Sequence, residues 1–270
     1  MKSRFIKVAV CALLMAIVSV SCSTVAFTGR NRLLMFSDSQ ITSLSDQSYA
    51  ELMTTAKKSL NTANAEMVRN VGMRLTSALQ KYCVATGQTS AIQGLSWDYQ
   101  LVQGKDVNAF CMPNGKIVFY DGMMQYANTP DLVAVVMGHE IAHAIARHGN
   151  ERMSQQAVVN MAGSVASQII GAKTSANARQ LFDTAFGIGS EYGIMLPFSR
   201  KHELEADEIG LIIMAIAGYD VDQAPVLWER MSAGSSSTVP EVLSTHPSNA
   251  TRIHKIKEFL PKAKGYVGKY

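Results

Sequence analysis

Two histidines four residues apart, His139 and His143, interrupt a stretch of the sequence that is otherwise apolar. Residues i and i+4 of a helix project from one face, so both imidazoles can reach a single tetrahedral metal ion. Glu140 follows the first histidine, where its carboxylate can bind a water on that metal. The alternative is a polar strip on an exposed helix, but this helix is apolar enough to be buried, and burial leaves such side chains in need of a partner. The sequence therefore predicts a metal site on a helix.

The ends of this helix are also marked in the sequence. Thr129 can cap its N-terminus, Pro130 suits the first helical position and Asp131 complements the helix dipole. Glycine commonly follows the last helical residue. We expect a helix from residue 129 to about His148 that stops at Gly149.

A further ligand must come from elsewhere, because two protein ligands and a water leave one coordination position open. The richest candidate segment is 199–208, at the start of a predicted helix. There Glu203 and Asp207 share a face, so Glu203 can bind the metal while Asp207 accepts a proton from the outer nitrogen of a ligand histidine. Glu205 and Glu208 are expected to face solvent. The alternative is that the charged residues of this segment simply form a solvent-exposed end of the helix.

The two motifs together resemble the zinc metalloendopeptidases that include BepA, HtpX and the CAAX prenyl endopeptidases, a gluzincin family with an HExxH motif. The likeness extends over most of residues 28–260 and is to the periplasmic, lipoprotein-type members. It implies an α+β, predominantly helical, zincin-like domain. Such a domain has a small β-sheet and an edge strand beside the active-site helix.

The resemblance also implies a mechanism with one zinc ion held by His139, His143 and Glu203. The ion would lower the pKa of its bound water to about neutral. Glu140 would act as general base while the water attacks a peptide carbonyl, and would then protonate the leaving amine. In this family an Asp lies four residues after the ligand Glu, and Asp207 occupies that place after Glu203.

Residues 108–115 resemble the family's segment ahead of the catalytic helix, so Asn108, Ala109 and Phe110 are expected to bind substrate. If residues 106–111 form an exposed edge strand, main-chain hydrogen bonds would fix an extended substrate above the metal. This favours unfolded or loosely folded protein substrates. The alternative is that a loop covers this edge.

His246 lies in a Ser-Thr-His-Pro segment that resembles the family's C-terminal return to the active site. Its imidazole could stabilise the oxyanion or occupy the fourth zinc position and hold the enzyme inactive; a turn-capping role is the alternative. Arg252 could hold a carboxylate or a substrate carbonyl, or lie on the outer face of the last helix. The remaining histidines, His148, His202 and His254, are expected at the surface.

The N-terminus has the pattern of an export signal. Residues 1–7 hold three cations and residues 8–20 are apolar but too short for a membrane span. The small residue Ser21 before Cys22 resembles a lipoprotein cleavage site, so we expect a signal peptide over 1–21 and a lipid on Cys22. Plain secretion is the alternative. In an oxidising compartment Cys83 and Cys111 could form a disulfide or remain two buried thiols.

The rest of the chain reads as a single unit. Residues 22–44 are expected to be a tether and extended lead-in, 45–262 one metallopeptidase domain, and 263–270 a C-terminal tail. The expected strands are at 97–102 and 116–120. The other expected helices cover residues 45–60, 62–85, 151–171, 176–195, 199–217, 222–233 and 248–260.

Composition excludes two classes of protein. Hydrophobic residues make up 47% of the chain and charged residues 17%, which is unlike a disordered chain. Without the three cations of the signal, 22 cationic side chains face 21 anionic ones, so the charge gives no reason to expect a nucleic-acid partner.

The expected function is a zinc metalloendopeptidase that cleaves unfolded or misassembled envelope proteins. The expected location is the periplasmic side of a bacterial envelope, with the lipid in the outer membrane and the outer-membrane assembly machinery as a further partner. One alternative is a chaperone-like assembly factor with a latent or structural metal site. A metal-free helical lipoprotein is another.

Overall fold

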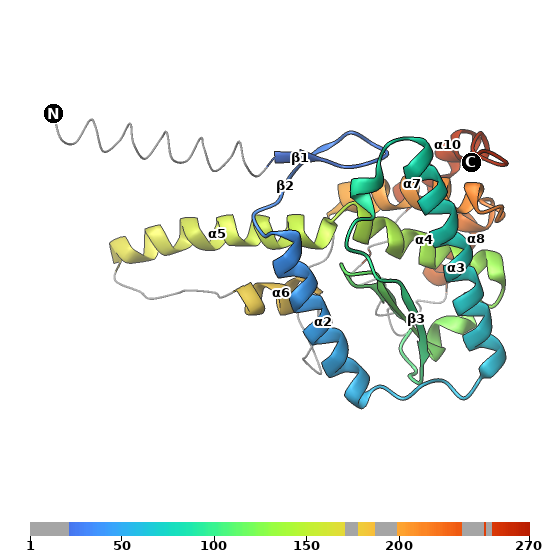
Figure 1. The fold of residues 1–270 in the computed structure, drawn as a ribbon, viewed down its shortest axis with the longest axis horizontal. Coiled ribbons are helices and arrows are strands. Elements are labelled where there is room, and N and C mark those ends of the chain that lie inside the picture. Colours follow the sequence, from blue (N-terminus) through green and yellow to red (C-terminus); the bar gives the residue numbers. More distant parts are fainter. Residues whose placement is uncertain (1–21, 171–177, 187–198, 234–245, 247–249) are drawn as a thin grey trace.

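The structure is a computed structural model that describes residues 22–170, 178–186, 199–233, 246 and 250–270. Helices predominate among these residues and two small sheets accompany them, so the predicted α+β class is confirmed (Figure 1). The helices are α2 (Asp38–Thr55), α3 (Thr62–Ala85), α4 (Pro130–Ile145), α5 (His148–Ile170), α6 (Ala178–Phe186), α7 (Arg200–Ile216), α8 (Gln223–Ala233) and α10 (Ala250–Lys264). The strands are β1 (Cys22–Thr24), β2 (Asn31–Leu33), β3 (Asp98–Val102), β4 (Ala109–Cys111) and β5 (Lys116–Tyr120), and the 3-10 turns are η1 (Thr89–Ala91) and η2 (Asp121–Gln125).

The apolar helix α4 lies at the centre of the core. All its residues from Leu132 to Ile145 are buried, and it packs against α3, α7, α8 and β4. Its N-terminus is where the sequence places it, since the Thr129 hydroxyl accepts a hydrogen bond from the N–H of Leu132. Ser199 caps α7 in the same way through the N–H of His202. The two helices that hold the predicted metal ligands therefore begin as expected.

Helices α4 and α7 approach closely because glycines face each other at their crossing. A β-carbon added to Gly210 would lie 2.9 Å from the carbonyl carbon of Gly138, and one added to Gly138 would lie 3.2 Å from the carbonyl oxygen of Gly210. No side chain separates the two backbones at this point. The first turn of α7 is thus brought against the His-Glu-x-x-His face of α4.

The larger sheet has the strand order β3-β5-β4, with β3 parallel and β4 antiparallel to β5. Among the described residues β4 pairs with β5 alone, so it is an edge strand and it packs on α4. The turn at Pro113-Asn114-Gly115 joins β4 to β5, and Gly115 has φ +91°. The strands predicted at residues 97–102 and 116–120 are confirmed as β3 and β5.

The segment expected to be a tether is folded against the body. Residues 22–33 form the antiparallel β1–β2 hairpin, in which Cys22 pairs with Leu33. Helix α2 begins at Asp38, seven residues before the expected start, because Ser37 and Gln40 form a capping box. The expectation of an extended lead-in over 22–44 was wrong, since polar capping residues and the buried Val25 give this stretch its own structure.

The break between α4 and α5 also differs from the expectation. Helix α4 ends at Ile145 and α5 begins at His148, so Gly149 lies inside a helix and does not end one. The turn is made by Arg147, which has φ +55°. Much of the expected helix at 176–195 lies outside the described residues, which include α6 only.

The remaining expectations concern the cysteines and the C-terminus. Cys83 and Cys111 are both free and buried, so the disulfide alternative was wrong. Burial raises the pKa of the Cys83 thiol to about 11. Helix α10 continues to Lys264, with Pro261 inside it, and Ala263 in the expected tail is buried.

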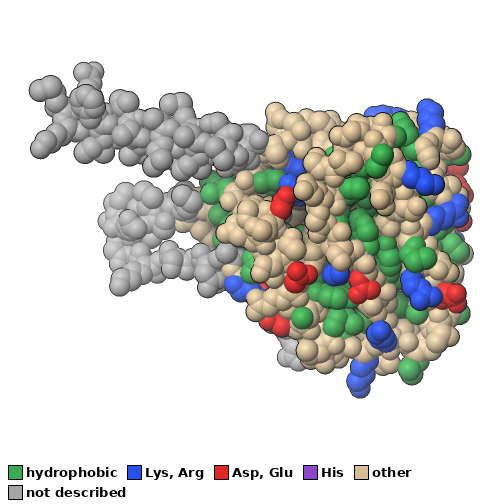
Figure 2. Space-filling view, viewed as in Figure 1, with side chains coloured by type: hydrophobic (Ala, Val, Ile, Leu, Met, Phe, Trp, Pro, Cys, Tyr) green, Lys and Arg blue, Asp and Glu red, His purple; other side chains and the backbone are tan. Residues whose placement is uncertain are grey.

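No helix of the described residues has both the length and the apolar character that crossing a bilayer requires. Cationic and anionic side chains are interleaved on the face shown in Figure 2.

Candidate metal centre

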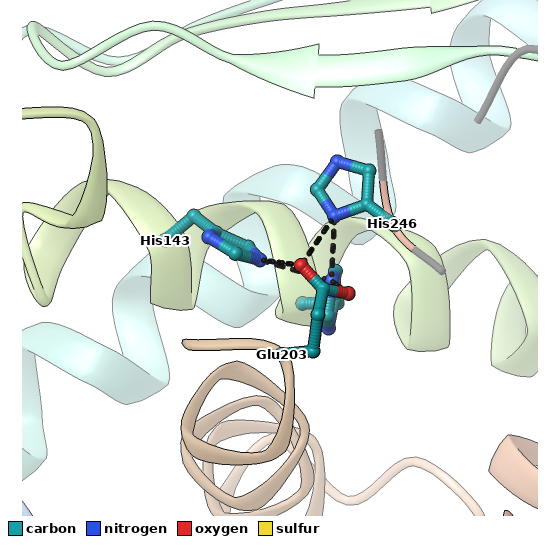
Figure 3. A group of neighbouring side chains, drawn as sticks. His143, Glu203 and His246 are labelled. Atoms are coloured by element: carbon teal, nitrogen blue, oxygen red, sulfur yellow. Dashed lines mark hydrogen bonds and ion pairs between the residues drawn. The ribbon is translucent and has the colours of Figure 1, made fainter. Parts of the chain in front are cut away.

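Four buried side chains from separate parts of the chain converge at the N-terminal end of α7. His139 and His143 come from α4, Glu203 from α7 and His246 from the segment before α10, and one ligand atom of each lies within 4.8 Å of all the others. In Figure 3 the side chains of His143, Glu203 and His246 point toward one another. The structure thus brings together the residues that the two motifs and the Thr-His-Pro segment single out.

The distances in this cluster fit a metal ion. His139 Nε2 lies 3.1 Å from His143 Nε2 and 3.2 Å from His246 Nδ1, and Glu203 Oε1 lies 3.3 Å from His143 Nε2 and 3.0 Å from His246 Nδ1. Nitrogen ligands of a tetrahedral zinc, each about 2.0 Å from the ion, are about 3.3 Å apart. Three imidazoles and a carboxylate are also a donor set that zinc accepts. The residues present therefore fit a divalent ion of the zinc type.

Glu140 lies beside the cluster and outside the ligand group. Its Oε1 is 3.6 Å from His246 Nε2, and its carboxylate accepts a hydrogen bond from the main chain of Cys111 in β4. Burial raises the pKa of Glu140 above its ordinary value. A carboxylate with a raised pKa next to a metal site is suited to taking up and releasing a proton.

Asp207 and Arg252 hold the outer side of His139. Asp207 Oδ1 is 2.9 Å from His139 Nδ1, the contact expected for a carboxylate that orients a ligand histidine. Arg252 is buried rather than on the outer face of α10, and its Nε and Nη2 donate to Asp207 at 2.7 and 2.8 Å. Its Nη1 lies 2.7 Å from Glu203 Oε2, and its guanidinium stacks on Trp228. Of the alternatives for Arg252, the structure has the one in which it holds carboxylates.

His246 uses both ring nitrogens within the site. Nδ1 is in the group of possible ligands, while Nε2 faces Glu140. This position differs from a turn cap at the surface, since the side chain is 4% exposed. The imidazole occupies the place that a fourth ligand would take.

The edge strand presents main-chain groups on the side of the site. Met112 donates to Lys116 and Tyr120 donates to Asn108, which makes Phe110 and Val118 a hydrogen-bonded pair by the alternation of an antiparallel ladder. The main-chain groups of Ala109 and Cys111 therefore point away from β5. Of the three residues expected to bind substrate, Ala109 has this orientation, Phe110 bonds to β5, and the Asn108 amide oxygen accepts from the Ala109 N–H at 2.9 Å.

A second buried polar cluster was missed by the sequence analysis. His148 and His202 stack at 4.4 Å and are both buried, as is Glu205, so the expectation that these three face solvent was wrong. Glu208 is half-buried, and His254 is exposed as expected. Burial lowers the pKa of His148 to about 4, which keeps the ring neutral near pH 7. His148 starts a different helix from His143, so helical spacing gave no signal that the two would meet.

Comparison with known proteins agrees with this geometry. The profile of Peptidase family M48 matches residues 73–260, well over half of the chain. The chain belongs to peptidase family M48. The match includes the His-Glu-x-x-His helix, Glu203, Asp207, His246 and Arg252, and the predicted metallopeptidase resemblance is confirmed at the level of this family.

The curated proteins that are similar to this chain include mitochondrial and bacterial ones. Over 176 residues the chain is 35% identical to the mitochondrial metalloendopeptidase OMA1 of Schizosaccharomyces pombe, covering 64% of this chain and 50% of that protein. It is 28% identical over 244 residues to the human OMA1, covering 87% and 45%. It is 30% identical over 193 residues to the beta-barrel assembly-enhancing protease of Escherichia coli, covering 70% and 37%. The chain spans half or less of the length of these three relatives.

Proposed function

We propose that the chain is a zinc-dependent endopeptidase that cleaves unfolded or misassembled proteins of a bacterial envelope. The observation that supports it best is the convergence of His139, His143 and Glu203 beside a buried Glu140 with a raised pKa. A structural metal site needs no general base next to its ligands, whereas a hydrolytic site does. The arrangement therefore favours catalysis over a structural role.

The division of roles follows from the contacts. His139, His143 and Glu203 would hold the ion, and Asp207 and Arg252 would orient His139 and Glu203. Bound zinc supplies Lewis-acid activation of water and of the peptide carbonyl. Glu140 takes the proton of the attacking water and donates it to the leaving amine. The Cys111 N–H, by hydrogen bonding to Glu140, fixes that carboxylate against the edge strand.

His246 has a regulatory place in this proposal. Its Nδ1 lies among the ligand atoms, so in this arrangement the fourth position is filled by protein. A substrate and a water need that position, and His246 must then move aside. The resting enzyme would be closed until His246 leaves that position.

The proposed substrates are chains that can add a strand. The main-chain carbonyls of Ala109 and Cys111 point away from β5 on the side of Glu140, and an extended peptide that donates to them would lie along the site; the N–H groups of these two residues already bond to Asn108 and Glu140. Folded proteins rarely present a free extended segment, so unfolded or misassembled ones would be preferred. Assembly machinery of the outer membrane is a proposed partner, in keeping with the name of the Escherichia coli relative.

The proposed location is the envelope, with a lipid on Cys22. The support is the short export signal ahead of Cys22 and the bacterial relative, whereas the OMA1 relatives are mitochondrial.

The test compares casein cleavage by wild type and by Glu140→Gln, each as purified and after zinc removal by a chelator. Wild type should cleave, lose activity on chelation and regain it with Zn²⁺, and Glu140→Gln should bind Zn²⁺ but lose at least about 100-fold in kcat. Equal cleavage by both proteins would defeat the proposal. Zinc binding and client binding without cleavage by wild type would favour the chaperone-like alternative.

A further inference from the structure

The outer side of His143 faces the second buried cluster. His148 Nδ1 lies 3.0 Å from His143 Nδ1, and His148 Nε2 lies 2.9 Å from Glu205 Oε2. A neutral histidine that binds a metal through Nε2 keeps its proton on Nδ1, and that proton needs an acceptor. His148 Nδ1 can accept it only when the proton of His148 is on Nε2. Donation from Nε2 to Glu205 favours that tautomer.

Glu205 is held in turn by the β1–β2 hairpin. Arg30 Nε donates to Glu205 Oε2 at 2.7 Å, and the Thr28 hydroxyl donates to Oε1. The two terminal nitrogens of Arg30 donate to both oxygens of Glu151 in α5, at 2.8 and 2.7 Å. Arg30 thus joins the hairpin to α5 and α7 with a planar group that suits two carboxylates at once.

The hairpin is fixed independently at its tip and its second strand. Phe27 stacks on Tyr82 of α3 with ring centroids 4.4 Å apart, and Arg32 donates to the carbonyl of Ala146 just after α4. Because the hairpin is anchored on both sides, Arg30 reaches the cluster from a fixed base. The hairpin therefore has anchors that do not involve Arg30.

We infer that Arg30 is a positioning residue for the metal centre: it fixes the Glu205–His148 pair so that His148 accepts the Nδ1 proton of His143. This holds the His143 ring with Nε2 directed at the metal. The inference rests on the proposed function, since it takes His143 to be a ligand. It makes the N-terminal hairpin part of the support of a site whose ligands lie far away in the sequence.

The test uses the full chain and the metal alone, with no protein substrate. Zn²⁺ affinity is measured by competition with a chromogenic chelator, and the geometry of the site by the visible spectrum of the Co²⁺ form. Arg30→Ala should weaken Zn²⁺ binding about 10- to 100-fold and alter the Co²⁺ spectrum. The matched control is Arg179→Ala, because Arg179 also bridges two carboxylates, Asp183 and Glu51, but at α6 and α2. It should leave both readouts at wild-type values.

A double-mutant cycle separates positioning from general support of the fold. Glu205→Gln keeps the size of the side chain and an oxygen acceptor for His148. If Arg30 acts through Glu205, the double variant should bind Zn²⁺ about as well as the weaker single variant. Additive losses, or an Arg30→Ala protein with wild-type affinity and spectrum, would overturn the inference.

Two further outcomes are informative. If Arg30→Ala does not fold, Glu205→Gln and Thr28→Val serve in its place, and wild-type affinity in both would overturn the inference. A wild type that binds no Zn²⁺ would defeat the proposed function together with this inference. A wild type that binds Zn²⁺ and cleaves casein, beside Arg30 variants that bind equally well, would defeat the inference alone.

Discussion

Glu205 is ionised inside the protein because three donors reach its two oxygens. Burial opposes its ionisation, but hydrogen bonds from His148, Thr28 and Arg30 outweigh burial and lower its pKa to about 2. The ordinary glutamate pKa is about 4.3. The charged carboxylate therefore stabilises the folded protein, and this stabilisation is present only in the pH range in which Glu205 is ionised.

This gives a pH-dependent difference between wild type and Glu205→Gln. Because the folded pKa is lower than the unfolded one, the stabilisation is full above about pH 4.5 and is lost as pH falls toward about 2. At pH 6 the variant should be less stable by about 2 kcal/mol, and the gap should narrow between pH 4.5 and pH 3. Urea unfolding of the metal-free proteins at several pH values measures it, and a gap that widens on acidification would contradict the assignment.

Residue-scale prediction from sequence succeeded where partners are close along the chain. His139 and His143 are four apart, and so are Glu203 and Asp207, so helical geometry alone relates each pair. Glu205 was assigned to solvent because its partners Thr28 and Arg30 are more than 170 residues away. Nothing local to α7 distinguishes Glu205 from an exposed carboxylate.

The crossing of α4 and α7 decides whether Glu203 reaches the histidines. The two glycines at the crossing let the helix backbones approach without intervening side chains, and the ligand pair and Glu203 lie on the facing surfaces. A wider crossing would move Glu203 away from His139 and His143. The metal centre therefore depends on the absence of two β-carbons.

Gly210→Ala should lower both stability and zinc affinity. Its β-carbon would lie 2.9 Å from the backbone of Gly138, which cannot yield as a flexible side chain can, and overpacking of this kind costs about 1–3 kcal/mol. Gly138→Ala is the comparison, because its closest approach is 3.2 Å and its cost should be smaller. Thermal unfolding and chelator competition measure the two effects, and a Gly210→Ala protein as stable as wild type would refute the role of the crossing.

At the scale of helices and strands, prediction failed where the end of a helix is set by backbone geometry and not by a particular residue type. Gly149 was expected to end α4, but the turn is at Arg147, a residue that the sequence gives no reason to place at positive φ. The helix starts at Thr129 and Ser199 were predictable because their side chains make the cap themselves. The hairpin of residues 22–33 was missed because its stability comes from contacts with α3, α5 and α7.

At the scale of the whole molecule, the predicted lipid on Cys22 would determine where the proposed enzyme works. In a bacterial host, the wild type should sediment with membranes and incorporate labelled fatty acid, and Cys22→Ser should lose both properties because a secreted domain without a lipid has no anchor. Cys83→Ser is the control, since that thiol is buried in the core. Fractionation and fatty-acid labelling measure this, and a lipidated Cys22→Ser protein would contradict the assignment.

The hairpin that begins at Cys22 changes what such an anchor would do. A flexible lead-in over residues 22–44 would let the metal centre take up a wide range of positions, whereas Cys22 is paired with Leu33 in a hairpin that contacts three helices. An acyl chain on Cys22 would therefore hold the folded domain in a fixed position at the membrane and would not be a flexible tether. The fold would then set the distance between Glu140 and the membrane surface. Only polypeptides that come close to the membrane at that distance would reach the metal centre.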